Sequence, residues 1–378
     1  MRPLTETLPE RASEYIKTLD GWRALAVIAV LVSHSNPVDD AAHPAGKLGS
    51  LALVLMDRIG SAGVMVFFAI SGFLICSRLL ASEKKHSGIS LRTFYIRRAF
   101  RILPPALCYL LVLLALHWMG LLGAISHEPF NWGSWFGATF FVTNYLHVRM
   151  LSINHYWSLA VEEQFYFFWP GILAFGGHRT AAIFALASVL VVPVYRVLVL
   201  RSMPLADYAS TLEQTQMRLD SFMGPCLIAI LLTRPLWRKR FLLLSSSRWQ
   251  ITWIASIGVC SILPLFSQAL QPWQRGLMPS LITILVVSTT LNPDNWLGRL
   301  LELSPLRTIG RLSYSIYLWQ QLVLCCRVNA AAKMGTLYGI HRWEIVVTGL
   351  LLTALLCWLS YEWVEIPLIR VGRRWATE

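Results

Sequence analysis

An arginine and a histidine stand eleven residues apart in the apolar segment "DGWRALAVIAVLVSHS", Asp20–Ser35. At about 100° and 1.5 Å per residue, this spacing places Arg23 and His34 on one helix face, about 16 Å apart along the axis. A neutral imidazole, with an unperturbed pKa of about 6.5, can act as a general base near neutral pH. The alternative is that Arg23 extends to lipid headgroups and that His34 is an interfacial residue.

Two adjacent carboxylates occur in "NHYWSLAVEEQFYFFWP", Asn154–Pro170. Glu162 and Glu163 lie about two turns into an apolar, aromatic helix. Neighbouring helical residues point about 100° apart, so only one of the two need face a given cavity. A structural ion pair with a buried arginine is the alternative, because buried carboxylates need partners.

Three arginines precede an apolar span in "FYIRRAFRILPP", Phe94–Pro105. Arg97 and Arg101 share a helix face at i and i+4, and Arg98 lies between them. Guanidinium groups are well suited to binding phosphates. The alternative is that the three arginines only mark the cytoplasmic side and contact anionic lipids.

The composition predicts the kind of fold that positions these residues. Of 378 residues, 56% are hydrophobic and only 14% are charged, with a mean hydropathy of +0.55. A soluble domain has about 25% charged residues, so this chain lacks enough polar residues to cover a water-exposed surface. We therefore expect an all-α polytopic helical membrane protein. Residues 1–19 are polar and no small-residue cleavage site follows the first apolar run, so no cleaved signal peptide is expected.

The net charge of +13 does not indicate a nucleic-acid partner. The positive residues cluster in short loops beside apolar segments, as in the positive-inside pattern of membrane proteins. The seven cysteines are scattered without metal-ligand or disulfide spacing, so we expect buried apolar side chains and no metal.

Counting spans between the basic loops predicts the topology. The ten expected spans are about 20–36, 61–80, 102–123, 157–176, 180–200, 219–233, 250–268, 276–291, 312–328 and 343–366. Both termini are then cytoplasmic, with an N-terminal segment at 1–19, a membrane domain at 20–369 and a tail at 370–378. Segment 131–147 is expected to be re-entrant or interfacial, because a full crossing would move the basic loop 234–240 outside.

Seven motifs in order give the chain a resemblance to a known family. They are "DGWRALAVIAVLVSH", "FFAISGFLI", "RRAFRI", "WSLAVEEQFYF", "RLDSFMGP", "LSYSIYLW" and "EIP". Each is weak alone, but together they resemble the acyltransferase 3 family of bacterial membrane acyltransferases, from about Leu19 to Ile369.

The resemblance implies an activity and roles for several residues. Members transfer acyl groups, commonly acetyl, from cytoplasmic acyl-coenzyme A to hydroxyls of extracytoplasmic polysaccharides, lipid-linked sugars and related acceptors. It implies essential roles for Arg23 and His34, and donor handling by the arginines at 97, 98 and 101. Many members carry a histidine just after the tyrosine motif, where this chain has Gln320 and Gln321.

Within this family, acyl transfer predicts a division of roles. We expect His34 to be the general base, oriented by Glu162 or, as second choice, Glu163. Arg23 would contact the donor or stabilise the oxyanion. Direct transfer and an acyl-His34 intermediate are both compatible. The candidates for contacts with the saccharide acceptor are Asn144, Tyr166 and Tyr317.

Two other classes of function remain open at this level. A transporter or flippase also has many spans with polar residues at depth, but no inverted repeat is evident. A sensor or scaffold is favoured only if Gln320 marks lost catalysis. The expected location is the bacterial cytoplasmic membrane, with lipids as further partners, acetyl-CoA or another acyl-CoA as donor and no nucleic acid.

Overall fold

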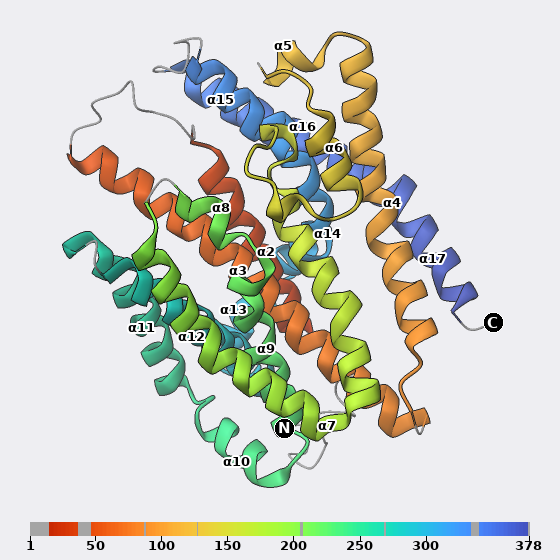
Figure 1. The fold of residues 1–378 in the computed structure, drawn as a ribbon, viewed down its shortest axis with the longest axis vertical. Helices are drawn as coiled ribbons and strands as arrows, with labels where there is room; N and C mark the ends of the chain where they lie inside the picture. Colours follow the sequence, from red (N-terminus) through yellow and green to blue (C-terminus); the bar gives the residue numbers. More distant parts are fainter. Residues whose placement is uncertain are drawn as a thin grey trace. The chain divides into compact units, whose positions relative to one another are not determined.

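The computed structural model is helical, as the composition predicts, and contains no strand among the residues that it describes (Figure 1). The described residues are 15–36, 47–86, 88–126, 128–204, 207–267, 270–333 and 340–376. Residues 1–14 of the predicted N-terminal segment lie outside this set.

The α-helices of the described residues vary widely in length. From the N-terminus, the α-helices are α2 (Lys17–His34), α3 (Lys47–His86), α4 (Leu91–Trp118), α5 (Leu122–Ser126), α6 (Trp132–Thr139), α7 (Tyr156–Ser202), α8 (Tyr208–Leu212), α9 (Thr215–Leu231), α10 (Pro235–Leu243), α11 (Ser247–Phe266), α12 (Gln271–Leu291), α13 (Trp296–Leu301), α14 (Ser304–Gln320), α15 (Cys326–Lys333), α16 (Ile340–Ser360) and α17 (Ile366–Trp375). Two 3₁₀ turns, η1 (Thr143–Tyr145) and η2 (Leu151–Ile153), and two π-helical turns, η5 (Gln321–Cys325) and η6 (Tyr361–Glu365), complete the order.

The chain divides into two compact units. Unit 1 comprises residues 1–26, 62–91 and 161–311, and unit 2 comprises residues 27–61, 92–160 and 312–378. Several helices, including α2, α3, α7 and α14, begin in one unit and end in the other.

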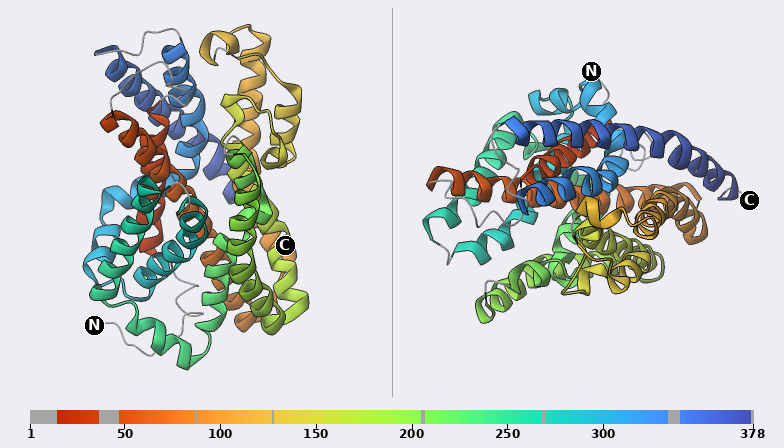
Figure 2. Two further views of the ribbon diagram at one scale, coloured as in Figure 1. Left: turned by 60° about the vertical axis from the view of Figure 1, so that its left-hand side comes forward. Right: turned by 90° about the horizontal axis from the view of Figure 1, so that it is seen from above.

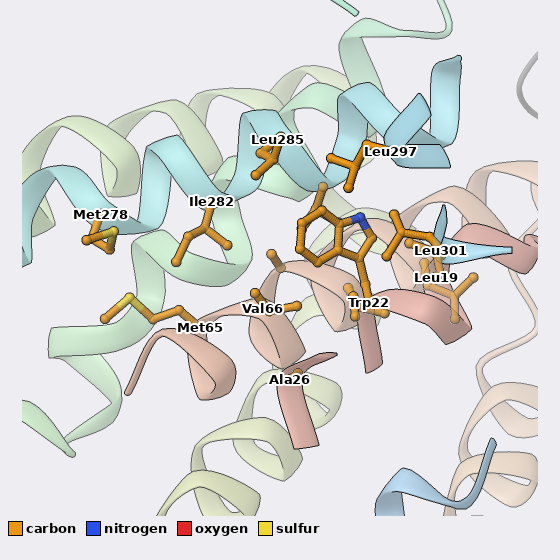
Figure 3. Packing of buried hydrophobic residues seen from close by; sticks show 14 of the residues in the cluster. Leu19, Trp22, Ala26, Met65, Val66, Met278, Ile282, Leu285, Leu297 and Leu301 are labelled. Atoms are coloured by element: carbon orange, nitrogen blue, oxygen red, sulfur yellow. The ribbon is translucent and has the colours of Figure 1, made fainter. Parts of the chain in front are cut away.

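The apolar core of unit 1 gathers around the first turns of α2. The Trp22 indole lies among leucines of α12 and α13 (Figure 3), and its Nε1 donates a 2.8 Å hydrogen bond to Thr289. The labelled members of the core are Leu19, Trp22, Ala26, Met65, Val66, Met278, Ile282, Leu285, Leu297 and Leu301. In lipid, close packing and hydrogen bonds of this kind hold helices together, because the tails are as apolar as the side chains.

Two glycines allow backbones of unit 1 to touch: Gly72 in "FFAISGFLI" and Gly310, two residues before "LSYSIYLW". A Cβ atom on Gly72 would lie 2.5 Å from the carbonyl oxygen of Phe222, and one on Gly310 would lie 1.8 Å from that of Asp20. Any side chain would force α3 away from α9, or α14 away from the start of α2. Both glycines are therefore required for packing.

The run α7 is two helical segments joined at a break. Gly177 has φ 71° and ψ 176°, which no helix contains, and the chain reverses direction there (Figure 1). Glycine adopts this positive φ without the steric cost of a Cβ atom. The break falls between the predicted spans 157–176 and 180–200.

Unit 2 contains most of α4, the end of α14 and the C-terminal helices. The π-helical turn η6 joins α16 to α17, and the three follow one another as one long helical rod that ends at the C-terminus (Figure 2). A small apolar cluster of Leu324, Val328, Ala331 and Val346 packs η5 and α15 against α16. Turns of π-helix often mark functional sites, because each places one extra residue in the helix.

The apolar span predicted at 102–123 lies in a helix that starts before it and ends at Trp118. Helix α4 starts at Leu91, so Arg97, Arg98 and Arg101 lie within it, ahead of the predicted span, and Arg97 and Arg101 are four positions apart on it. Arginine is a good helix former, so the charges do not end the helix. The helix ends before Gly120, which has φ 70° and whose N–H donates a hydrogen bond to the His117 carbonyl.

The described residues contain four helices long and apolar enough to cross a membrane, or five if one bent pair counts as a single span. The four are 54–85, 91–118, 151–202 and 343–375, and the bent pair is α9 with α10, at 119°. Ten spans with cytoplasmic termini therefore remain a prediction. In segment 131–147 the eight-residue α6 is about 12 Å long, too short to cross a bilayer core of about 30 Å. Its re-entrant or interfacial placement also remains a prediction.

Candidate active site

A neutral amide holds the His34 imidazole at the end of α2. The Nδ1 atom of His34 lies 2.8 Å from Oε1 of Gln320, the last residue of α14. An amide oxygen can only accept a hydrogen bond, so Nδ1 carries the hydrogen of the neutral ring. The lone pair is then on Nε2, which makes Nε2 the nitrogen that can take a proton from a substrate.

Further hydrogen bonds fix the direction of the Gln320 amide. Its Nε2 donates to the Tyr317 carbonyl, at 3.3 Å, and to Oε1 of Gln321, at 3.4 Å. The Gln321 Nε2 in turn donates to the Leu151 carbonyl at 2.6 Å. Because each NH₂ group faces an acceptor, the Gln320 oxygen is the atom that faces His34. Both glutamines are buried, so water competes little for these bonds.

An exposed carboxylate of α3 also acts on His34. Asp57 lies close enough to attract a protonated His34 ring. The expected partners Glu162 and Glu163 belong to unit 1, whereas His34 and Asp57 belong to unit 2. Orientation of His34 by Glu162 or Glu163 stays a prediction.

A second histidine of unit 2, His155, is buried with its ring nitrogens unused. It is 3% exposed, and neither nitrogen has a hydrogen-bond partner among the described residues. The ring is close enough to His34 for charges on the two rings to repel each other. A buried donor or acceptor without a partner costs about 1–3 kcal/mol, so this arrangement is unfavourable unless another group uses the nitrogens.

Three tyrosines surround the His155 ring edge-on. The ring centroids of Tyr109, Tyr156 and Tyr317 lie 5.2, 4.9 and 5.6 Å from that of His155. The tyrosine hydroxyls bond elsewhere: Tyr109 to the Ser152 carbonyl, Tyr156 to the Ala106 carbonyl, and Tyr317 to Ser158 Oγ at 2.5 Å and the His155 carbonyl at 3.3 Å. The tyrosines therefore position the imidazole without occupying its nitrogens.

The first of the two adjacent carboxylates is held by hydroxyls of unit 1. Glu162 accepts hydrogen bonds from Ser71 of α3 and from Tyr166, whose Oη lies at 2.5 Å. Tyr166, a predicted acceptor contact, is 2% exposed, and its hydroxyl also bonds Ser71 at 2.8 Å. Glu163 is half-buried on the next position of α7.

Arg23 forms a local ion pair in the first turns of α2. Its Nη1 lies 2.7 Å from Oδ1 of Asp20, whose side chain is 2% exposed and also accepts from Tyr15. The Arg23 side chain retains 18% exposure. The Asp20 carboxylate partly neutralises the guanidinium, and part of the Arg23 side chain remains accessible.

The three arginines of α4 differ in burial. Arg97 is exposed, whereas Arg98 and Arg101 are half-buried. Arg101 lies close enough to attract the carboxylate of Glu365, which accepts a hydrogen bond from Ser315. Arg97 is therefore the most accessible of the three to a phosphate.

Two further polar residues have structural surroundings. Asp220 forms a buried 2.5 Å pair with Arg196, which also donates to the carbonyls of Met217 and Arg275. Asn144, a predicted acceptor contact, lies in η1 with 1% exposure. In the described part of the chain, no group of three or more histidine, cysteine and acidic side chains could hold a metal.

Sequence reasoning identified His34 but not its two neighbours in unit 2. Gln320 was noted only as a departure from the family pattern, although it is the partner of the His34 ring. His155 stands directly before the "YWSLAVEEQF" segment, which carries the acidic pair Glu162 and Glu163. An imidazole at the start of an apolar span was the available signal, since ionisable residues at membrane depth are rare.

Comparisons with known proteins give relatives across the membrane part of the chain. It is 28% identical over 385 residues to a putative peptidoglycan O-acetyltransferase, YrhL, of Bacillus subtilis. It is 25% identical over 381 residues to the O-acetyltransferase OatA of Staphylococcus aureus, and 26% identical over 378 residues to the peptidoglycan O-acetyltransferase OatA of Listeria monocytogenes. Each match covers 95% of this chain but only 56% to 58% of the relative. No solved structure matches.

The profile of one family, Acyl_transf_3, described as an acyltransferase domain, matches residues 16–362. This range contains His34, His155 and Gln320, the acidic pair and the arginines of α4, and it confirms the resemblance drawn from the motifs. The chain therefore belongs to this acyltransferase family.

Proposed function

We propose that the protein transfers an acetyl group from acetyl-coenzyme A to a hydroxyl of an extracytoplasmic glycan. The names of the relatives support peptidoglycan as the first acceptor to test. Ten spans, cytoplasmic termini and a place in the bacterial cytoplasmic membrane belong to the same proposal. The donor is then available on the inner side and the glycan on the outer side.

The observation that carries the proposal is the bond between His34 and Gln320. It leaves the lone pair of His34 on Nε2, so this nitrogen acts as the general base that removes the acceptor hydroxyl proton. The charge of Asp57 favours the resulting imidazolium. Because Gln320 occupies Nδ1 and the acceptor faces Nε2, Glu162 or Glu163 would act on the ring through its charge and not through a hydrogen bond. The deprotonated oxygen attacks the acetyl carbon of the thioester.

The arginines have a separate role in the proposal. Arg23 lies eleven residues before His34 on α2, a rise of about 16 Å along the helix. Helical side chains lean towards the N-terminus, and Arg23 pairs with Asp20 in that direction. Arg23 therefore binds the donor away from the reacting carbon, and Arg97, Arg98 and Arg101 bind its phosphates.

Acetyl transfer in a reconstituted system tests the function. Purified protein in liposomes receives acetyl-CoA labelled in the acetyl group, with soluble peptidoglycan fragments as acceptor. We expect labelled ester that mild base releases from the glycan. Labelled acetyl-CoA or glycan that crosses the bilayer with no ester formed would support a transporter, and absence of both would support a sensor or scaffold.

The acceptor contacts are tested in the same system. Tyr317→Phe, which keeps the ring beside His155, is expected to raise the KM for the glycan fragment if Tyr317 binds it. Asn144 and Tyr166 are buried in the described structure, so we expect smaller changes from Asn144→Ala and Tyr166→Phe. An unchanged KM in all three variants would remove them from the acceptor site.

A further inference from the structure

The base alone does not complete the chemistry of acetyl transfer. Attack on the thioester carbonyl places negative charge on its oxygen, and enzymes stabilise this oxyanion with a hydrogen-bond donor at about 3 Å. Arg23 pairs with Asp20, and its role as the oxyanion donor stays a prediction. A donor in the surroundings of His34 itself would lie in the same unit as the base.

Two donor groups near His34 in unit 2 are already committed. The Gln320 amide donates to Tyr317 and Gln321, and the Tyr317 hydroxyl bonds Ser158 and the His155 carbonyl. The ring of His155 differs, since its two nitrogens are buried and have no partner among the described residues. Three tyrosine rings and the bonds to its carbonyl hold it in place, so it needs no reorganisation before reaction.

We propose that His155 is a second catalytic residue, whose neutral imidazole donates an N–H hydrogen bond to the acetyl carbonyl oxygen of the donor. The inference rests on the proposed function, because it assumes a thioester at His34. A positive charge on this buried ring, beside His34, would be costly. A neutral imidazole still has one N–H donor, which is sufficient for an oxyanion.

The step balances with the groups named. The acceptor oxygen forms a bond to the acetyl carbon while its proton moves to His34 Nε2, and the carbonyl electron pair moves to the oxygen bonded by His155. When the carbonyl re-forms, the carbon–sulfur bond breaks. The oxyanion pair re-forms the carbonyl, and sulfur leaves with the electron pair of the carbon–sulfur bond and takes the proton from His34. His155 ends the cycle with its own proton.

Steady-state kinetics of His155→Phe are the first test. Phenylalanine keeps a flat ring among the tyrosines but removes both nitrogens. We expect kcat to fall about 10²–10³-fold, as for loss of one oxyanion donor, with the KM for acetyl-CoA changed by less than about threefold. His155→Gln, which restores an N–H donor, is expected to recover part of kcat. The matched control is His117→Phe, the same change at a half-buried histidine of unit 2 that stacks on Phe130.

The carbonyl stretch of bound acetyl-CoA is the second test and needs no turnover. With acetyl-CoA carrying a ¹³C carbonyl, difference infrared spectra of the wild type are expected to show the stretch at lower wavenumber than in free donor. In His155→Phe the stretch is expected to return towards the free value, while His117→Phe leaves it shifted. If His155→Phe does not fold, the same comparison is made with His155→Gln and His155→Leu.

The outcomes separate this inference from the function it rests on. If the wild type forms no labelled ester, the proposed function fails first. If the wild type is active and His34→Ala is inactive, but His155→Phe retains kcat and the shifted stretch, only the role of His155 is overturned. A fall in kcat without a change in the stretch, and without recovery in His155→Gln, also overturns it and leaves a packing role.

Discussion

The polar groups of the two units are satisfied in different ways. In unit 1, carboxylates are held by close partners: Asp220 by Arg196, Asp20 by Arg23, and Glu162 by two hydroxyls. In unit 2, an imidazole is held by a neutral amide, and a second imidazole keeps both nitrogens unused. Paired charges hold a fold together, whereas unused nitrogens are available to a substrate. On the proposed function, proton transfer would therefore belong to unit 2.

Replacement of the base is the largest expected effect on activity. We expect His34→Ala to lower acetyl transfer about 10²–10⁴-fold, the usual contribution of general-base catalysis, with no loss of thermal stability. The measurement is labelled ester formed per enzyme, together with the midpoint of heat denaturation in detergent. If the His34→Ala variant stays active, the hypothesis that proton transfer takes place in unit 2 is wrong.

Removal of a paired carboxylate in unit 1 is expected to affect stability more than chemistry. Asp220→Ala leaves the buried Arg196 charge without its partner, which typically costs about 3–5 kcal/mol. The midpoint of heat denaturation should fall, and the residual folded protein should keep its kcat. Asp220→Asn, which retains a hydrogen-bond acceptor, serves as the milder control. Loss of kcat at unchanged stability would contradict the contrast between the units.

The arginines of α4 are expected to affect only the donor. Arg97→Ala combined with Arg101→Ala should raise the KM for acetyl-CoA about tenfold, because an ion pair of an exposed or half-buried arginine contributes up to about 1 kcal/mol and about 1.4 kcal/mol is a factor of ten. The KM for the glycan fragment should stay constant. Equal changes in both KM values, or no change, would mean that these arginines only mark the cytoplasmic side and contact lipids.

The amide partner of His34 is expected to have the smallest effect. Gln320→Leu removes one hydrogen bond to the ring, worth about 0.5–1.5 kcal/mol, so kcat should fall about tenfold at most. Gln320→His restores the residue that the family pattern implies and should recover activity. A fall as large as that of His34→Ala would mean that Gln320 contacts the substrate.

The helical fold and the family could be predicted because both depend on features local to the sequence. Apolar runs and ordered motifs favour membrane helices, and the glycines at 72 and 310 are close backbone contacts. The break at Gly177 falls between the predicted spans 157–176 and 180–200, because glycine is the residue that adopts this positive φ without steric cost. Apolar runs do not mark where a helix begins, since α4 continues through the charged residues ahead of its predicted span.

The partners of the site residues could not be predicted from spacing. The distance from His34 to Gln320 is 286 positions in sequence, and the bond depends on how the ends of α2 and α14 meet within unit 2. The same holds for the ring of His155, whose tyrosine neighbours come from α4, α7 and α14. Residue type indicates which side chains can react, but only the tertiary structure shows which of them already have hydrogen-bond partners.

The π-helical turn that follows Gln320 holds one more residue than a turn of α-helix would. Deleting one residue between Gln321 and Cys325 would let the turn relax into ordinary α-helix, and the helix beyond it would keep nearly the same phase. Gln321 and Cys325 would then stand three positions apart instead of four, so the contact between the Gln321 amide and the Cys325 sulfur would change. A single-codon deletion here therefore alters the surroundings of the two glutamines while leaving the rest of the helix almost unmoved.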